Sequence, residues 1–179
     1  MSYAFHAWAL DLEALRTRCA TRSTLAEVVA AQPEAVADFG RWFADEIEEG
    51  APRLDQALGR LLQGDSGHGW AQAYALELIC RHIGQRLPDE GLSGIRWSWV
   101  ERVDQALASA GCPFRLAELE DPPVRLPTIP DFPMVGLATR HELAQLEALP
   151  TPEDPDVALA FASLRAWARS GRDVVTFYY

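Results

Sequence analysis

One predicted helix carries the side chains best suited to chemistry. Residues 70–83 (WAQAYALELICRHI) form the most apolar stretch of the chain, and their pattern predicts a central helix that ends at Gly84. Because Glu77 stands among apolar residues, we expect it to be buried with a raised pKa, which suits a general acid or base. His68 precedes the helix in a glycine-rich loop, where it would reach a pocket mouth. One face of the helix gathers, at helical spacing, Trp70, Tyr74, Glu77 and Arg81.

The same residues also allow a purely structural interpretation. An ion pair between Glu77 and Arg81, with the Tyr74 hydroxyl nearby, would satisfy a buried charge without any function. If the Glu77 carboxylate is fully enclosed and paired with Arg81, no functional site is expected there. A pocket lined by His68, Tyr74, Glu77 and Arg81 would instead favour a small enzyme or ligand-binding domain.

The charge of the chain indicates which partners it would attract. All 16 basic residues are arginine, 26 residues are acidic, and the net charge is −10. Nucleic acid and anionic membrane surfaces are therefore not expected partners, since both are bound by neutralising phosphates. The acidic excess lies in two windows, residues 34–49 and 142–156, which are either solvated faces or a surface for a basic partner.

Two groups of residues are candidates for contact with a protein partner. A helix predicted from Pro33 to about Glu49 would end in acids that its own dipole opposes, which indicates a basic partner or a local Arg53. These acids are Asp45, Glu46, Glu48 and Glu49. The second group is Phe132 and Met134, in a proline-rich segment over residues 113–133 that is either a recognition loop or a cover over the core.

The elements around these candidates predict one α+β domain over residues 1–179, mostly helical. Residues 2–10 and 173–179 predict terminal strands that share a small sheet backed by helices, and residues 135–138 predict another short strand. Thr24 with Glu27, and Thr139 with Glu142, are predicted capping boxes. The remaining predicted helices cover residues 11–19, 24–32, 52–63, 95–110, 139–148 and 156–169, with Trp97 and Leu159 inward.

Several classes of function find no support in the residues. No nucleotide-binding loop, nucleophile elbow or paired-cysteine motif occurs, and the four histidines are widely spaced, so we expect neither a metal nor a cofactor. Three cysteines, Cys19, Cys80 and Cys112, fit no disulfide framework, so a reducing cytoplasm is expected. No apolar run is long enough for a membrane span, and the first residues do not resemble a signal peptide.

Several stretches together resemble a family of small uncharacterised bacterial proteins from GC-rich genomes. The matching stretches are SYAFHAWALDLEALR, LDQALGRLLQGD, YALELICRHIG, IPDFPMVGLATRHEL and DVVTFYY. The order of elements is also distantly similar to the YfbM-like family. The resemblance implies an α+β fold and assigns no functional residues.

Two functions from different classes follow from these observations. The first is a non-enzymatic protein-binding module, an immunity protein that neutralises a basic bacterial toxin, which small acidic proteins without catalytic motifs resemble. The alternative is a small enzyme or ligand-binding domain built around Glu77. The third hypothesis is a scaffold or regulatory protein without a dedicated partner surface. No pattern in the residues indicates an oligomeric state.

Overall fold

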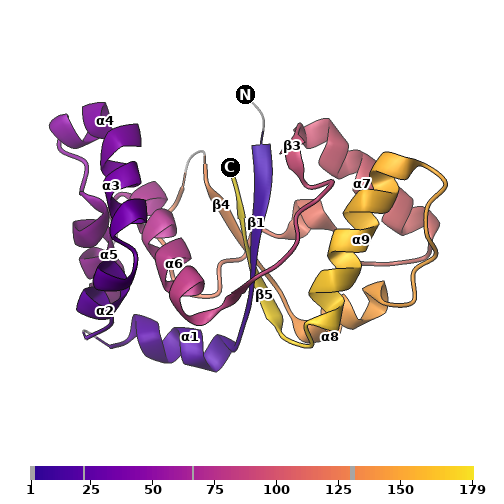
Figure 1. The fold of residues 1–179 in the computed structure, drawn as a ribbon, viewed down its shortest axis with the longest axis horizontal. Coiled ribbons are helices and arrows are strands. Elements are labelled where there is room, and N and C mark those ends of the chain that lie inside the picture. Colours follow the sequence, from indigo (N-terminus) through magenta and orange to yellow (C-terminus); the bar gives the residue numbers. More distant parts are fainter. Residues whose placement is uncertain (1–2, 22, 66, 130–131) are drawn as a thin grey trace.

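The centre of the fold is a five-stranded antiparallel sheet (Figure 1). The computed structural model describes residues 3–21, 23–65, 67–129 and 132–179. The sheet order is β2-β1-β5-β4, and β3 pairs with the start of β1. The strands are β1 (Tyr3–Leu10), β2 (Gln85–Arg86), β3 (Ser93–Ile95), β4 (Met134–Ala138) and β5 (Asp173–Tyr178). The α+β fold class is thereby confirmed.

The two strands from the ends of the sequence lie side by side in this sheet, as predicted. β1 pairs with β5 from Phe5 opposite Tyr178 to Leu10 opposite Asp173. Alternate side chains of a strand point to opposite faces, and both faces of β1 are apolar. Phe5, Ala7 and Ala9 enter one hydrophobic cluster and Trp8 and Leu10 enter the other, so the sheet lies between two cores.

The first helical layer covers the face that carries Trp8 and Leu10 (Figure 1). Its central helix α6 is buried along most of its length, as its apolar sequence predicts. Asp11 caps α1 by accepting a hydrogen bond from the Ala14 amide at 2.7 Å. The helices of this layer are α1 (Leu12–Cys19), α2 (Thr24–Ala31), α3 (Pro33–Trp42), α4 (Ala44–Glu48), α5 (Leu54–Gln63) and α6 (Gly69–Ile83).

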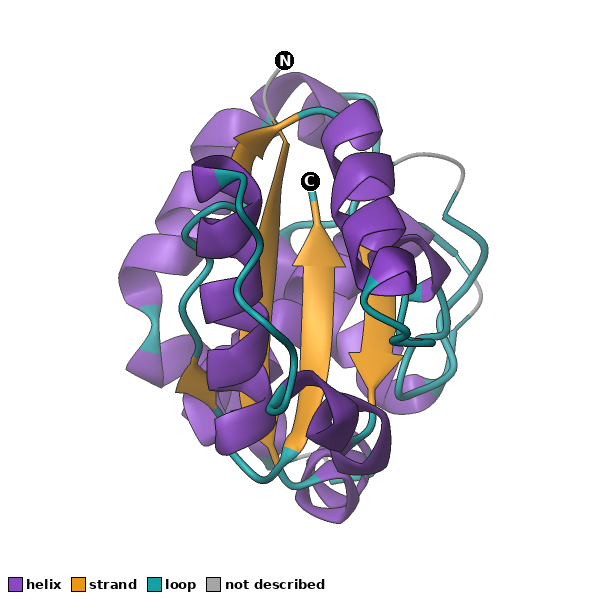
Figure 2. Cartoon of the chain, turned by 90° about the vertical axis from the view of Figure 1, so that its right-hand side faces the viewer, coloured by secondary structure: helices purple, strands orange, loops and turns teal. Residues whose placement is uncertain are grey.

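The second layer covers the opposite face, which Figure 2 places toward the viewer. The long helix α9 contributes Phe161, Leu164 and Trp167 to the core there. Thr139 and Glu142 form the predicted capping box at the start of α8. The elements of this layer are α7 (Trp97–Ser109), α8 (Arg140–Leu143), a 3₁₀ turn (Ala144–Leu146) and α9 (Pro155–Arg169). None of the described helices is both long and apolar enough to cross a membrane.

The prediction of one helix from Pro33 to Glu49 is wrong, because two helices, α3 and α4, cover this stretch. The chain leaves helical geometry at Phe43, with φ −118° and ψ 34°, and α4 begins a new helix after it. The Phe43 ring packs against Trp70 and Tyr74, so tertiary packing overrides the helical pattern at this point. Asp45 and Glu46 therefore lie in the first turn of α4, where a helix dipole favours acids.

Other expectations also fail locally. Thr24 and Glu27 form no capping box, because the Thr24 hydroxyl donates to the Arg18 carbonyl and the Glu27 carboxylate pairs with the Arg18 guanidinium at 2.6 Å. Trp97 and Leu159, expected inward, are 36% and 52% exposed. The Trp97 ring still meets the ring of the buried Tyr178 at 5.6 Å, so this residue is only partly turned outward.

The proline-rich segment over residues 113–133 contains no strand among its described residues. Within the described part of the segment, a 3₁₀ turn covers Leu116–Glu118 and is held by Asp104. The Asp104 carboxylate accepts from the Leu116 and Ala117 amides at 2.7 and 3.0 Å. The chain then crosses β4 so closely that a Cβ on Gly136 would overlap the Leu119 carbonyl. The segment thus covers the edge of the sheet.

Candidate functional site

A buried carboxylate with three hydrogen-bond donors marks the candidate site. Glu77 is 8% exposed. Its Oε1 lies 3.0 Å from His6 Nδ1 and accepts from Trp8 Nε1 at 3.3 Å, while its Oε2 accepts from the Tyr179 hydroxyl. An ionised carboxylate can only accept, so His6 Nδ1 carries the proton in this contact.

Strand and helix geometry bring these residues together. His6 and Trp8 are two positions apart on β1, so they point to the same face of the sheet, toward α6. Tyr179 directly follows β5, which pairs with β1, and it packs on the same side as Phe177. Glu77 lies on the face of α6 that packs on this sheet, so four side chains from three segments meet.

The hydrogen bonds decide the charge state of Glu77. Burial acts to raise the pKa of Glu77, but the hydrogen bonds and charge of His6, with the bonds from Tyr179 and Trp8, outweigh it and hold the pKa below its usual value. The prediction of a raised pKa is therefore wrong. Burial and the Glu77 charge raise the pKa of Tyr74 to about 12 and that of Tyr179 well above its usual range, so both hydroxyls stay protonated.

An open pocket of about 300 Å³ adjoins this carboxylate. We call it the Glu77 pocket. Its lining residues come from β1, α3, α5, α6 and the residue that follows β5. Its lining residues are His6, Glu34, Ala35, Asp38, Phe39, Trp42, Leu54, Tyr74, Glu77, Leu78, Arg81 and Tyr179.

Aromatic rings dominate the walls. Phe39 and Tyr74 meet edge to face with 5.4 Å between ring centroids, and Tyr74 lies 5.3 Å from Tyr179. Trp70 continues this cluster behind the pocket by stacking on Phe39 at 5.8 Å. The packed rings hold the walls in place, since aromatic pairs of this geometry add stability beyond their buried area.

The structure brings together three of the four residues predicted for the alternative site. Tyr74, Glu77 and Arg81 all line the Glu77 pocket. His68 does not, because it stands at the opposite end of α6 from Arg81, roughly 20 Å away at 1.5 Å per residue. Its Nδ1 lies 3.0 Å from the Arg60 guanidinium instead.

The competing interpretation, an ion pair between Glu77 and Arg81, is not what the structure shows. Within the ranges that the structure describes, no ion pair joins these two residues, and Arg81 is exposed at the pocket rim. The donors to Glu77 come instead from the terminal strands. A fully enclosed Glu77 carboxylate paired with Arg81 would have excluded a site, and the described residues show no such pair.

The arrangement offers a fixed negative charge under an aromatic cavity. His6 is half-buried, and the bond from its Nδ1 to Glu77 fixes the imidazole plane, as buried carboxylates do for catalytic histidines. Over the same described ranges, no three histidine, cysteine or acidic side chains gather closely enough to hold a metal ion. Cys80 and Cys112 are buried free thiols.

Comparison with known proteins places the chain in a family. Residues 1–179 match the family described as "Domain of unknown function (DUF7691)". The chain belongs to the DUF7691 family. No curated protein and no solved structure gives a significant match. The expected membership in an uncharacterised family that spans nearly the whole chain is thus confirmed. The distant likeness to the YfbM-like family stays a prediction.

The four acids predicted as a partner surface are all exposed on and just after α4. No arginine, Arg53 included, lies within ion-pair distance of Asp45, Glu46, Glu48 or Glu49 in the described part of the chain. The dipole argument that singled them out no longer holds for Asp45 and Glu46, which begin a helix rather than end one. Their exposure remains compatible with either a solvated face or a partner surface.

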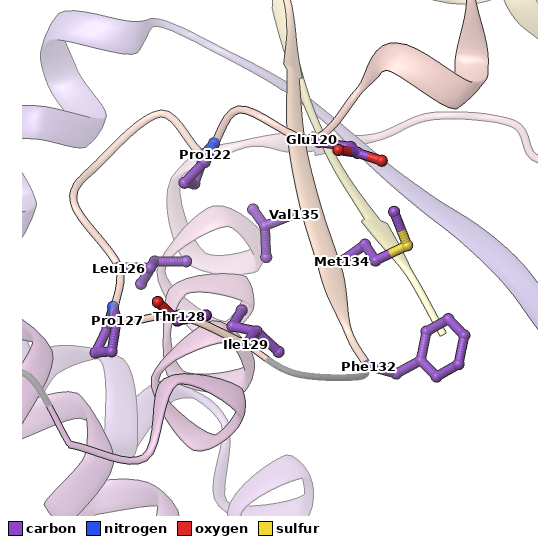
Figure 3. Close-up of a pocket in the computed structure, with 9 residues that line it drawn as sticks. All are labelled: Glu120, Pro122, Leu126, Pro127, Thr128, Ile129, Phe132, Met134 and Val135. Carbon is purple, nitrogen blue, oxygen red and sulfur yellow. The ribbon is translucent and has the colours of Figure 1, made fainter.

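Phe132 and Met134 lie elsewhere, at a second hollow of about 530 Å³ beside the edge strand β4 (Figure 3). Phe132 meets the Tyr178 ring at 5.7 Å and packs against the hydrophobic cluster that contains Tyr178. Figure 3 shows Met134 and Val135 on opposite sides of the strand. Both predicted side chains are half-buried, so they cover the core, while their role in recognition stays a prediction. The neighbouring Asp131 lies outside the described residues.

Proposed function

We propose that this chain is a non-catalytic binding protein whose ligand occupies the Glu77 pocket. The observation that carries the proposal is the buried Glu77 carboxylate beside an open, aromatic-walled cavity of about 300 Å³. Ligand pockets typically combine apolar walls with a few fixed polar groups, and this volume is at the small end of their range. The ligand is therefore of metabolite size.

The charge state of Glu77 favours binding over acid–base catalysis. A general acid or base works best with a pKa near the operating pH. The donors around Glu77 instead lower its pKa from the usual value, so it stays ionised at neutral pH. A carboxylate that is charged at neutral pH and held by His6, Trp8 and Tyr179 is suited to recognition.

A cavity-filling substitution tests this function. Ala35 lines the pocket from α3, whereas Ala37 on the same helix is exposed and lies outside the pocket. We expect ligand-detected NMR with a library of small metabolites to find ligands of the wild-type chain. Ala35→Phe should abolish their binding, and Ala37→Phe should leave it unchanged. A library that yields no ligand, or ligands indifferent to Ala35→Phe, would contradict the proposal.

A second candidate function, protein binding, is favoured by the exposed acids of α4. Four carboxylates without an arginine partner in the described structure leave a negative surface, which speeds association with a basic protein. An immunity protein against a basic toxin would use such a surface. The cytoplasm remains the expected compartment for either function, and the buried free thiols Cys80 and Cys112 fit it.

The product of the neighbouring gene is the first partner to test. We expect it to copurify with the wild-type chain, and to do so less in the joint variant Asp45→Asn, Glu46→Gln, Glu48→Gln and Glu49→Gln. The loss should appear mainly as a slower association rate at low salt. Equal association of the variant and the wild type would reject this surface.

A further inference from the structure

Four aromatic side chains from three segments line the Glu77 pocket. Phe39 and Trp42 come from α3, Tyr74 from α6, and Tyr179 from the residue after β5. The face of an aromatic ring carries a negative quadrupole, which attracts a cation within about 6 Å of the ring centre. Several rings around one small cavity are the arrangement that recognises alkylated ammonium groups.

Trp42 is the most informative of these rings. It is 68% exposed, although large apolar side chains gain stability by burial. No ring contact or cation over its face occurs among the described residues, so its indole is available at the pocket rim. Tryptophan gives the strongest attraction for a cation among the aromatic residues.

The charges of the pocket select the same kind of ligand. Three carboxylates line it, from Glu34, Asp38 and Glu77, against one guanidinium, from Arg81, and the His6 imidazole, which is already bound to Glu77. Asp38 is paired with Arg41, but Glu34 makes no ion pair within the described ranges. A negatively charged ligand would be repelled by the carboxylates, whereas a positive group would gain from them and from the rings.

We infer that the Glu77 pocket, in the binding role proposed above, takes the ammonium group of a small organic cation. The alkylated ammonium lies against Trp42 and Tyr74, with Glu34 and Asp38 on the solvent side and Glu77 below. Arg81 at the rim would bind a polar or acidic group at the other end of the same ligand. Glu34 and Asp38, at the start of the acidic window over residues 34–49, thereby have a role separate from that of the acids on and just after α4.

Three probes of the same shape and different charge test the ligand class. Choline, its neutral isostere 3,3-dimethylbutan-1-ol and the anion 3,3-dimethylbutanoate are titrated separately into the wild-type chain, with calorimetry and tryptophan fluorescence as readouts. We expect choline to bind about tenfold or more tightly than the neutral alcohol, which corresponds to the gain from a desolvated cation–π contact. The anion should bind least.

Matched variants locate the binding. Trp42→Ala should weaken choline binding about tenfold, and Glu34→Gln should weaken it severalfold. The controls Trp97→Ala, an exposed tryptophan on α7, and Glu48→Gln, an exposed acid on α4, should change it less than twofold. Because Trp42 and Glu34 are both exposed, neither variant should unfold the chain, and thermal melting checks this.

The outcomes separate this inference from the proposed function. If the neutral alcohol or the anion binds as tightly as choline, and Ala35→Phe blocks it, the pocket is a ligand site but not a cation site. If choline fails to bind while other library members do, the inference also falls and the binding function stands. If no probe and no library member binds, both fall.

Discussion

His6 on the first strand and Glu77 on the central helix are 71 positions apart, yet 3.0 Å separates the imidazole Nδ1 from the carboxylate Oε1. This contact ties the sheet to α6 at the Glu77 pocket. Trp8 and Tyr179 add two further bonds to the same carboxylate. The side chains that make the pocket are thus the ones that join two layers of the fold.

Removing the Glu77 carboxylate should cost stability. Glu77→Ala leaves three buried or half-buried donors without their acceptor, and each unsatisfied buried group costs about 1–3 kcal/mol. We expect urea denaturation to show a loss of about 2–5 kcal/mol in the free energy of unfolding. Glu34→Gln, at an exposed carboxylate of the same pocket, is the control and should change it by less than about 0.5 kcal/mol.

The stability of the chain should depend on pH through Glu77. Its pKa is lowered in the folded state from the usual value of 4.5, so the unfolded state binds the proton more tightly. The stabilisation is fully present above pH 4.5 and is lost as the pH falls through the folded pKa. We expect the stability difference between the wild type and Glu77→Gln to shrink below that pH.

Urea titrations of both proteins at a series of pH values from neutral to acidic measure that difference. Glu77→Gln preserves the shape of the side chain and removes its titration, so other carboxylates cancel in the comparison. A difference that stays constant across the acidic range would show that Glu77 does not couple folding to protons.

The last strand should be indispensable for the fold. Phe177 is fully buried on the face of β5 that packs beneath α6, so Phe177→Ala leaves a cavity in the larger helical layer. We expect a loss of about 3–5 kcal/mol in unfolding free energy. Leu159→Ala removes an exposed side chain on α9 and should be nearly neutral. Equal melting temperatures for the wild type and Phe177→Ala would contradict this account of the core.

Gly136 on β4 should tolerate no larger residue. A Cβ at this position would overlap the backbone of Leu119, so Gly136→Ala must push the proline-rich segment off the edge of the sheet. We expect overpacking to cost about 1–3 kcal/mol by thermal or urea unfolding. Gly40 in α3 is the matched control, because a Cβ there meets nothing within 4 Å. Gly40→Ala should stabilise the chain by about 0.5–1 kcal/mol, the usual gain in a helix.

Local patterns predicted the elements well and their contacts poorly. The residues SYAFHAWAL predict a strand, and the alternation of side chains along a strand puts His6, Trp8 and Leu10 on one side. The apolar spacing of α6 placed Tyr74, Glu77 and Arg81 on one face. Each of these patterns is a property of a short stretch of chain, so the sequence carries it directly.

The partner of Glu77 could not be found in the same way. Arg81 was the natural candidate because it is one helical turn away, whereas His6 and Tyr179 become neighbours only when β1 and β5 pair beneath α6. The break at Phe43 has a similar cause, since the aromatic contacts that accompany it come from α6. Contacts between distant segments decide both points, and no local spacing encodes them.

The pairing of β1 with β5 also sets the order in which the molecule can assemble. These strands are separated by nearly the whole sequence, and they form the middle of the sheet on which both helical layers rest. Neither helical layer can bury its apolar face before β1 pairs with β5. Bringing these distant strands together lowers the entropy of the chain before the packing of the layers contributes any stability. The chain should therefore fold slowly for its size, with helices that form early and remain loosely packed until residues 173–178 reach the sheet.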